Sequence, residues 1–79
     1  MQSGAVSLAP GKTVGTHDTE GYEELVIPLE GRGELRIPGR APVPIAPGVV
    51  AYAPPHTAHD VANVGDGVFR YVFVAAPRR

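Results

Sequence analysis

Three side chains of this sequence, His17, Glu24 and His59, are of the types that bind divalent metal ions. Glu24 opens an apolar run, and a carboxylate at the head of a buried strand is costly unless it is hydrogen-bonded, protonated or bound to a cation. His59 follows the proline-containing segment 54–57, a turn rigid enough to hold an imidazole in place. If folding gathers the three side chains, they form one metal site.

The elements that must position these residues are predicted to be β-strands. Ten glycines and nine prolines alternate with short runs rich in Val, Ile and Tyr, and no apolar residues recur at helical spacing over ten residues. This pattern predicts an all-β sandwich or small barrel without a helix of ordinary length. The candidate strands, eight as an upper bound, are residues 5–8, 13–17, 24–29, 33–37, 42–45, 49–53, 59–63 and 68–75.

Two of these strands, 24–29 and 68–75, are apolar on both faces, so something must cover the second face. The other sheet of the sandwich or a partner subunit could do so, and for so small a domain we expect at least partial cover by a second copy of the chain, which predicts a homodimer. Pro28 lies inside an otherwise strand-like run and cannot donate a hydrogen bond to a sheet. It therefore predicts an edge position or a bulge.

The length and composition set limits on the class of protein. Seventy-nine residues make one domain, 1–79, with a core over about 5–75. Because the chain has no cysteine, a bound metal or a second subunit is the expected reinforcement of so small a core. The formal net charge of −1, without a basic stripe, excludes a nucleic-acid partner. With no membrane-length apolar run and no signal segment, we expect a cytoplasmic protein that does not enter a membrane.

Two stretches of the sequence have a spacing that resembles a known pair of motifs. The first places five residues between Gly11 and His17, one before Thr19, four before Glu24 and six before Gly31. The second places five residues between Gly48 and Pro54, one before His56, two before His59 and three before Asn63. These stretches resemble the two motifs of the cupin family, G-x(5)-H-x-H-x(3,4)-E-x(6)-G and G-x(5)-P-x-G-x(2)-H-x(3)-N, with two family positions substituted.

The resemblance implies a jelly-roll β-sandwich that holds a metal ion near its centre. Carried over by position, the ligands are His17, Glu24 and His59, while Thr19 occupies the position of the family's second histidine. Two histidines and one carboxylate leave open coordination positions and are compatible with Fe, Mn, Ni, Co or Zn.

Other residues near this site have open roles. The Thr19 hydroxyl is a poor metal ligand, although it can hydrogen-bond a metal-bound water or a substrate oxygen. His56, where the family has Gly, either replaces the lost ligand or lines the rim of a pocket, and its turn position favours a positive φ. Tyr71 belongs to the core or presents its hydroxyl to the cavity as a substrate-binding group. Asp18 and Asp60 are expected to be solvated charges.

The function that these features favour is a metal-dependent enzyme acting on a small oxygen-rich metabolite. Fe(II) would suit a dioxygenase, whereas Mn, Zn or Ni would suit an isomerase or lyase. Two alternatives from other classes stay open: a non-catalytic module that binds a metal or a small ligand, as in a sensor, and a metal-free structural dimer.

Overall fold

A computed structural model describes residues 1–78, so Arg79 of the predicted domain lies outside the described residues. Its regular elements are eight β-strands: β1 (Gln2–Leu8), β2 (His17–Asp18), β3 (Tyr22–Glu30), β4 (Gly33–Arg36), β5 (Val43–Ile45), β6 (Ala51–Ala53), β7 (Ala58–Asn63) and β8 (Phe69–Pro77). The described residues form no helix, which confirms the all-β prediction. Accordingly, no helix in this part of the chain could cross a membrane.

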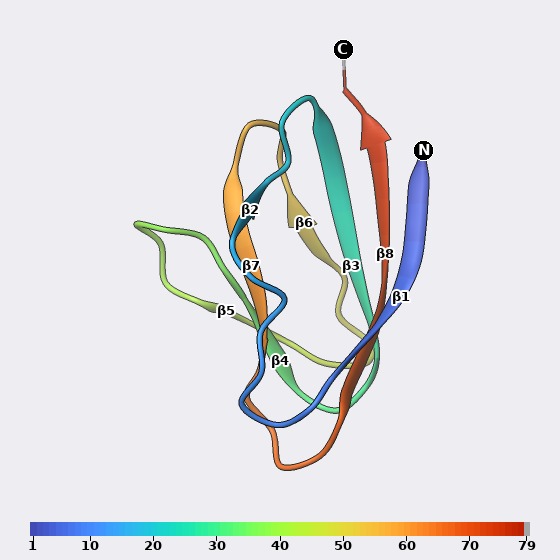
Figure 1. Ribbon diagram of the computed structural model, residues 1–79, viewed down its shortest axis with the longest axis vertical. Helices are drawn as coiled ribbons and strands as arrows, with labels where there is room; N and C mark the ends of the chain where they lie inside the picture. The colour runs from blue at the N-terminus through green and yellow to red at the C-terminus, as the bar shows by residue number, and fades with distance from the viewer. Residues whose placement is uncertain (79) are drawn as a thin grey trace.

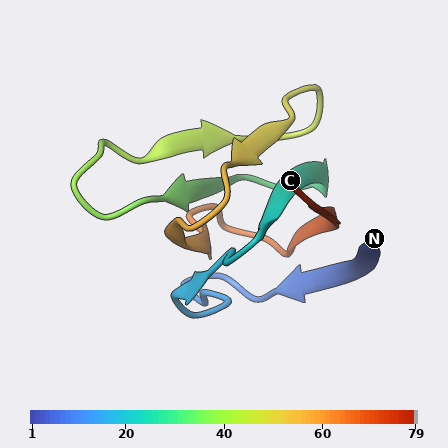
Figure 2. The same ribbon diagram turned by 90° about the horizontal axis from the view of Figure 1, so that it is seen from above.

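The strands form two antiparallel sheets of four. One has the order β1-β8-β3-β6 and the other β2-β7-β4-β5, so strands far apart in the sequence lie side by side. In Figure 1 the first sheet occupies one side of the molecule and the second sheet the other, with the β4–β5 hairpin extending outward. Figure 2 shows from above how the chain passes back and forth between the two layers. This is the predicted jelly-roll arrangement.

The core lies between the sheets and is built by alternating residues of the strands. Val26, Val61 and Phe69 are almost completely buried, and the rings of Phe69 and Tyr71 pack with centroids 5.4 Å apart. On β3 the opposite set faces outward, since Leu29 is half exposed. Both apolar faces predicted for this strand are therefore present, and only one of them is covered within this chain.

Of the two alternatives predicted for Pro28, the bulge is confirmed, whereas β3 is an inner strand of its sheet and not an edge strand. The pairing of β3 with β6 covers only Glu24 to Val26, so Pro28 lies beyond the end of β6. On its other side β3 pairs with β8, and the register shifts between Pro28 and Glu30, as at a β-bulge. The missing N–H of proline thus falls where the regular pairing of the strand is interrupted.

The strand predicted over 13–17 is wrong in its extent. Only His17–Asp18 forms a strand, and Thr13 makes an isolated bridge with Ala62. Gly15 lies between them and has a φ of +103°, which is incompatible with a continuous β-strand. The strand predicted over 49–53 likewise shortens to Ala51–Ala53 after Gly48, which has φ +98°.

Candidate metal centre

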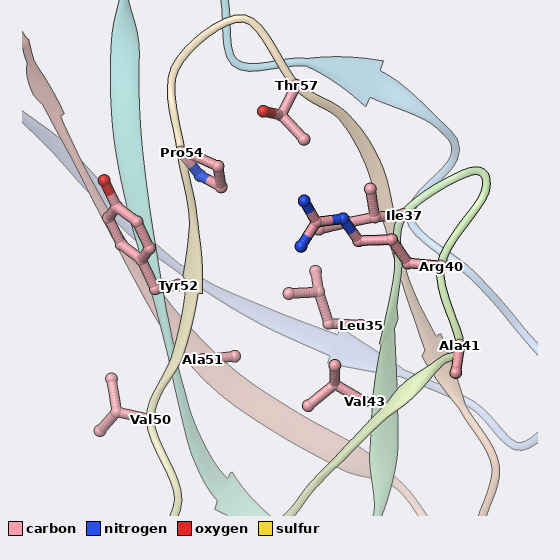
Figure 3. A pocket seen from close by; sticks show the side chains of 10 residues that line it. All are labelled: Leu35, Ile37, Arg40, Ala41, Val43, Val50, Ala51, Tyr52, Pro54 and Thr57. Carbon is pink, nitrogen blue, oxygen red and sulfur yellow. The ribbon is translucent and has the colours of Figure 1, made fainter.

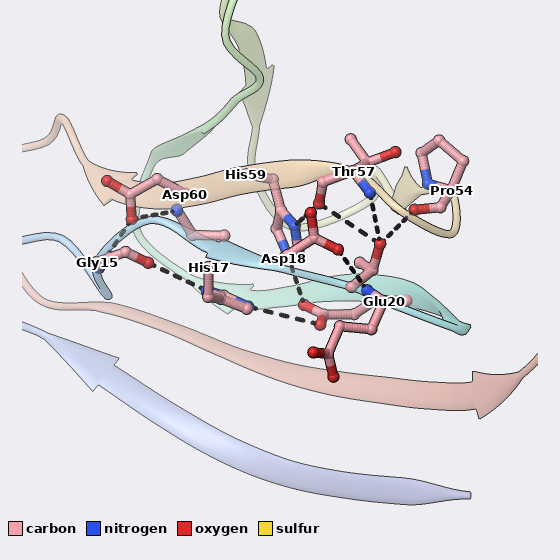
Figure 4. A network of polar contacts seen from close by, with 11 residues as sticks. Gly15, His17, Asp18, Glu20, Pro54, Thr57, His59 and Asp60 are labelled. Carbon is pink, nitrogen blue, oxygen red and sulfur yellow. Dashed lines mark hydrogen bonds and ion pairs between the residues drawn. The ribbon is translucent and has the colours of Figure 1, made fainter.

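His17 and His59 lie opposite each other on the paired strands β2 and β7, and Glu24 reaches them from β3 in the other sheet. The two imidazole rings have centroids 4.3 Å apart, and Figure 4 shows them side by side. Glu24 Oε1 lies 3.9 Å from His17 Nε2, and Glu24 Oε2 lies 3.6 Å from His59 Nε2. One ligand atom from each residue lies within 4.8 Å of the others, so the fold brings the three predicted residues together.

The same hydrogen-bond arrangement orients both imidazoles. Nδ1 of His17 lies 3.1 Å from the carbonyl oxygen of Gly15, and Nδ1 of His59 lies 3.1 Å from that of Thr57. Because a carbonyl can only accept, each ring carries its proton on Nδ1 when neutral. The Nε2 lone pairs are then directed toward Glu24, the tautomer that a metal-binding histidine requires.

His59 Nε2 carries the strongest indication of a missing partner. It is the one buried side-chain nitrogen or oxygen without a hydrogen-bond partner among residues 1–78. The nearby Glu24 carboxylate raises the pKa of His59 above its ordinary value of 6.5, although burial of the ring lowers it. An unpartnered polar atom this deep costs about 1–3 kcal/mol, a cost that a bound cation removes.

The spacing of these atoms is close to what one divalent ion requires. Two donor atoms that bind one ion at about 2.1 Å lie at most about 4.2 Å apart. The two separations from Glu24, 3.9 and 3.6 Å, meet this limit, while the three ligand atoms together lie within 4.8 Å of one another, so an ion bound by all three would draw the side chains slightly closer. The side chain of His17 is 45% exposed, so it is the ligand with most freedom to adjust. Two imidazoles and a carboxylate suit a borderline transition metal better than Ca²⁺ or Mg²⁺.

Asp60 holds the loop that orients His17. Its Oδ1 accepts hydrogen bonds from the backbone N–H groups of Gly15, at 2.9 Å, and Val61, at 2.8 Å. Gly15 in turn provides the carbonyl for His17 Nδ1. The prediction that Asp60 is merely a solvated charge is therefore wrong.

Asp18 has a comparable role in the turn after β2. Its Oδ1 accepts a hydrogen bond from the N–H of Glu20 at 2.6 Å, an Asx-type turn that stabilises the left-handed φ of +53° at Glu20. The Glu20 carbonyl accepts a hydrogen bond from His56 N at 2.7 Å, and His56 also has a positive φ, +54°. The positive φ predicted for His56 is thus confirmed. These bonds tie the β2–β3 turn to the β6–β7 loop at one end of the centre.

The buried side chain of Thr19 also links the β2–β3 turn to the β6–β7 loop. Its hydroxyl donates to the Pro54 carbonyl at 2.7 Å and accepts from Thr57 N–H at 3.0 Å, and only 7% of the residue is exposed. The hydroxyl proton is therefore already engaged within the protein. The sequence left open a hydrogen bond from this hydroxyl to a metal-bound water or a substrate oxygen. In the structure the hydroxyl bonds to Pro54 and Thr57 instead.

His56 is not part of the metal cluster. Within residues 1–78 the group of potential ligands comprises His17, Glu24 and His59, and His56 is exposed at the turn. The possibility that it replaces the fourth ligand is therefore not supported.

Tyr71 lies beside the centre and faces inward. It lines a cavity of about 230 Å³ together with His17, Glu24, Phe73, Val6 and Val14. Burial raises the pKa of Tyr71 to about 12, with a further contribution from the negative charge of Glu24, so its hydroxyl keeps its proton at neutral pH. A second cavity, of about 320 Å³, also has His17 and Glu24 in its wall and extends along the β2–β3 turn. The centre is thus reached from the side of the sandwich where β1 and β2 lie.

Asn63 is a further supporting residue whose role was not predicted beyond its place in the motif. Its Nδ2 donates to the carbonyls of Leu8 and Gly67, both at 2.8 Å, and its Oδ1 accepts from Gly65 N. The side chain thus joins the end of β1 to the β7–β8 turn. A buried Asn at the end of an apolar strand is the sequence signal for such a role.

Comparisons with known proteins agree with this fold. Residues 4–75 match a family model described as a cupin domain. A protein from Thermotoga maritima described as a predicted oxalate decarboxylase is 29% identical, with a TM-score of 0.88 over 96% of this chain and 65% of its own. A Cupin 2 conserved barrel domain protein from Salinispora arenicola is 34% identical, with a TM-score of 0.82 over 92% of this chain and 60% of its own. No curated protein matches the chain.

A third structure supports the fold alone. An RmlC-like cupin family protein with a double-stranded β-helix fold from Methanocaldococcus jannaschii is 20% identical, with a TM-score of 0.87 over 96% of this chain and 69% of its own. The chain spans about two thirds of the length of these structures. What they bind or catalyse as whole proteins therefore does not transfer directly to this chain.

Proposed function

Since this chain belongs to the cupin family, we propose that it holds a divalent transition-metal ion. The ligands are Nε2 of His17, the carboxylate of Glu24 and Nε2 of His59. We further propose that the protein is a metal-dependent enzyme acting on a small oxygen-rich molecule. The observation that carries the proposal is the buried, unpartnered Nε2 of His59 facing the Glu24 carboxylate at 3.6 Å. Fe, Mn, Ni, Co and Zn all suit this ligand set.

The charge of the site indicates the class of substrate. Two neutral imidazoles and one carboxylate leave a net charge near +1 on a divalent ion, which favours an anionic or enolisable oxygen ligand. Such an ion supplies Lewis-acid polarisation of a substrate oxygen or, as Fe(II), the means to react with dioxygen. The neighbour described as a predicted oxalate decarboxylase supports a small carboxylate-bearing substrate.

The protein's own residues bind and orient such a molecule. The Tyr71 hydroxyl, which keeps its proton because burial raises its pKa to about 12, is available to donate a hydrogen bond to a substrate oxygen. Val6, Val14 and Phe73 line the same cavity and provide apolar contacts for the substrate. A cavity of about 230 Å³ with these walls favours a compact substrate.

The alternative is a non-catalytic module that binds a metal or a small ligand. A storage site would be closed around its ion, whereas here His17 is 45% exposed and borders two cavities. This openness favours the enzyme. The metal-free structural dimer leaves the unpartnered His59 Nε2 without explanation.

Metal content after expression and purification without a metal-affinity column tests the metal part of the proposal. We expect about one equivalent of a transition metal in the wild type and in His56→Ala, which serves as the matched control because His56 lies outside the cluster. His17→Ala and His59→Ala should lose most of it. Equal metal content in all four proteins would reject the ligand set.

Catalysis needs its own test. The metal-loaded protein, titrated with oxalate and with a chelating keto acid, should give a saturable calorimetric signal that His59→Ala lacks. Turnover of a compound from a panel of small oxygen-rich acids would then identify an enzyme. Binding without turnover across the panel would favour the non-catalytic module.

We also propose that the chain forms a homodimer through the outer face of the β1-β8-β3-β6 sheet. Apolar residues gather on this face in register, Leu25 opposite Tyr52 and Val74, and Ile27 opposite Val72. Leu25, Leu29 and Tyr52 are 39%, 51% and 44% exposed. A two-fold axis would place this face against its own copy.

Sedimentation analysis of one charged variant tests the dimer. Leu25→Glu should be monomeric where the wild type is dimeric. Val64→Glu, the same chemical change at a residue that is 41% exposed outside this face, should remain a dimer. A monomeric wild type would reject the proposal.

A further inference from the structure

A larger cavity lies at the opposite edge of the sandwich, between the β4–β5 hairpin and β6. Its volume is about 510 Å³, within the range of small-molecule sites. Leu35, Ile37, Val43 and Ala51 provide apolar side chains around it, as Figure 3 shows. None of the residues that line it belongs to the His17, Glu24 and His59 cluster.

Arg40 is the one charged residue in the lining of this cavity. Figure 3 shows its guanidinium projecting from the hairpin across the opening, toward Thr57 and Pro54. The turn that carries it is closed by a hydrogen bond from Arg40 N to the Ile37 carbonyl at 3.0 Å, with Gly39 at φ +82°. The ion pairs of arginines in residues 1–78 involve Arg36, Arg70 and Arg78, so none neutralises Arg40.

The hydroxyl groups of the other polar side chains in the lining already donate hydrogen bonds within the protein. Thr57 Oγ1 donates to the Pro55 carbonyl at 3.0 Å, and the Tyr52 hydroxyl donates to Glu23 Oε1 at 3.1 Å. Arg40 is therefore the side chain that can still donate to a ligand in this cavity. One cationic donor beside apolar walls suits a ligand with one anionic group and an apolar body, and it does not suit a polyol.

We propose that this cavity is a second ligand site, independent of the metal centre, that binds a small amphipathic carboxylate. The carboxylate is held by the Arg40 guanidinium, whose planar fork matches it in two parallel hydrogen bonds. The hydrocarbon part packs against Leu35, Val43 and Ala51. This site goes beyond the proposed function and does not depend on it.

The cavity is nevertheless adjacent to the metal centre through one residue. Thr57 is part of its lining, while the Thr57 carbonyl accepts the Nδ1 proton of His59. Binding is therefore best measured on metal-free protein, where a response cannot come from a ligand on the metal. Failure of metal binding and failure of this proposal are then separate results.

The test is a titration of the isotope-labelled full chain in the presence of a chelator, with hexanoate as the probe and hexan-1-ol as its uncharged match, followed by NMR. We expect saturable shifts at Leu35, Ala51 and Thr57, with hexanol binding about tenfold more weakly because it lacks the charge-assisted hydrogen bonds. Arg40→Gln should weaken hexanoate binding by a similar factor. Arg70→Gln, an exposed arginine on the other sheet, should bind as the wild type does.

Three outcomes would overturn the proposal. Shifts confined to His17, Tyr71 and Phe73 would place the ligand in the metal-side cavity instead. Equal affinity of Arg40→Gln and the wild type would show that Arg40 does not hold the carboxylate. Absence of saturable shifts with hexanoate would show that the cavity does not bind an amphipathic carboxylate.

Discussion

Glu24 approaches the two histidines with different oxygens, Oε1 at 3.9 Å from His17 Nε2 and Oε2 at 3.6 Å from His59 Nε2. The carboxylate comes from one sheet and both imidazoles from the other, so the centre joins the two layers of the sandwich. A metal ion bound there would cross-link the sheets. Its free energy of binding would add to the stability of the fold, by about 2.7 kcal/mol at a free metal concentration one hundred times the Kd.

Asp60 is predicted to affect metal affinity without touching the ion. Asp60→Ala removes the acceptor for Gly15 N–H, so the carbonyl that orients His17 becomes less fixed. We expect metal affinity to fall about tenfold, as for other residues that orient a ligand indirectly. Asp60→Asn keeps an oxygen at this position and should bind metal nearly as the wild type does. Isothermal titration with Zn²⁺ measures both, and equal losses in the two variants would indicate a role for the charge instead.

Thr19 is predicted to stabilise the fold rather than to ligate. Thr19→Val keeps the shape but loses the hydrogen bonds to Pro54 and Thr57, so the free energy of unfolding should fall by about 1–3 kcal/mol. Thr19→Ser retains the hydroxyl and should lose less. Chemical denaturation of the metal-free proteins gives these values. A Thr19→Val variant of unchanged stability but lower metal affinity would contradict this assignment.

The pKa of His59 predicts opposite pH trends for the metal-free protein and for metal binding. Glu24 raises the pKa of His59 in the folded state, so the stability that this group contributes is fully present below 6.5, its ordinary value, and is lost as the pH rises through the higher folded pKa. A metal ion requires the neutral imidazole, so metal affinity rises over the same interval. The increase in Tm caused by the metal should therefore grow between about pH 6 and about pH 8. A constant increase would show that His59 is not a ligand.

A variant of Tyr71 is predicted to weaken ligand binding without affecting metal binding. Tyr71→Phe keeps the ring packed beside Phe69 and removes only the hydroxyl of this cavity-lining residue. We expect metal content to stay unchanged and the affinity for a carboxylate ligand of the metal-loaded protein to fall about fivefold to tenfold. Calorimetric titration with oxalate measures this. Unchanged oxalate affinity would leave Tyr71 as a core residue only.

The sequence allowed the centre to be predicted more completely than its surroundings. His17, Glu24 and His59 could be grouped because the spacing of their two stretches resembles the cupin motifs, and the structure places them on strands β2, β3 and β7. If the strand continued past Asp18, alternation would place the side chain of Thr19 on the same face as that of His17. The strand β2 instead ends at Asp18, and the chain then turns through Glu20, which has a left-handed conformation.

The supporting contacts of the centre could not be read from local patterns. The bond between Asp60 and Gly15 joins residues 45 positions apart, and the bonds from Thr19 to Pro54 and Thr57 span 35 and 38 positions. Such contacts depend on how the turns pack against each other after the sheets form. The cavity beside Arg40 also depends on such packing, since its walls come from β4, β5, β6 and the loops next to them.

The most direct measurement of the central claim is an anomalous difference map from crystals of the protein loaded with Co²⁺, recorded at the cobalt absorption edge. The proposed centre predicts one strong peak about 2.0–2.2 Å from Nε2 of His17, Nε2 of His59 and a carboxylate oxygen of Glu24. A map with no peak among these three residues, or with its only peak on exposed side chains such as His56, would contradict it.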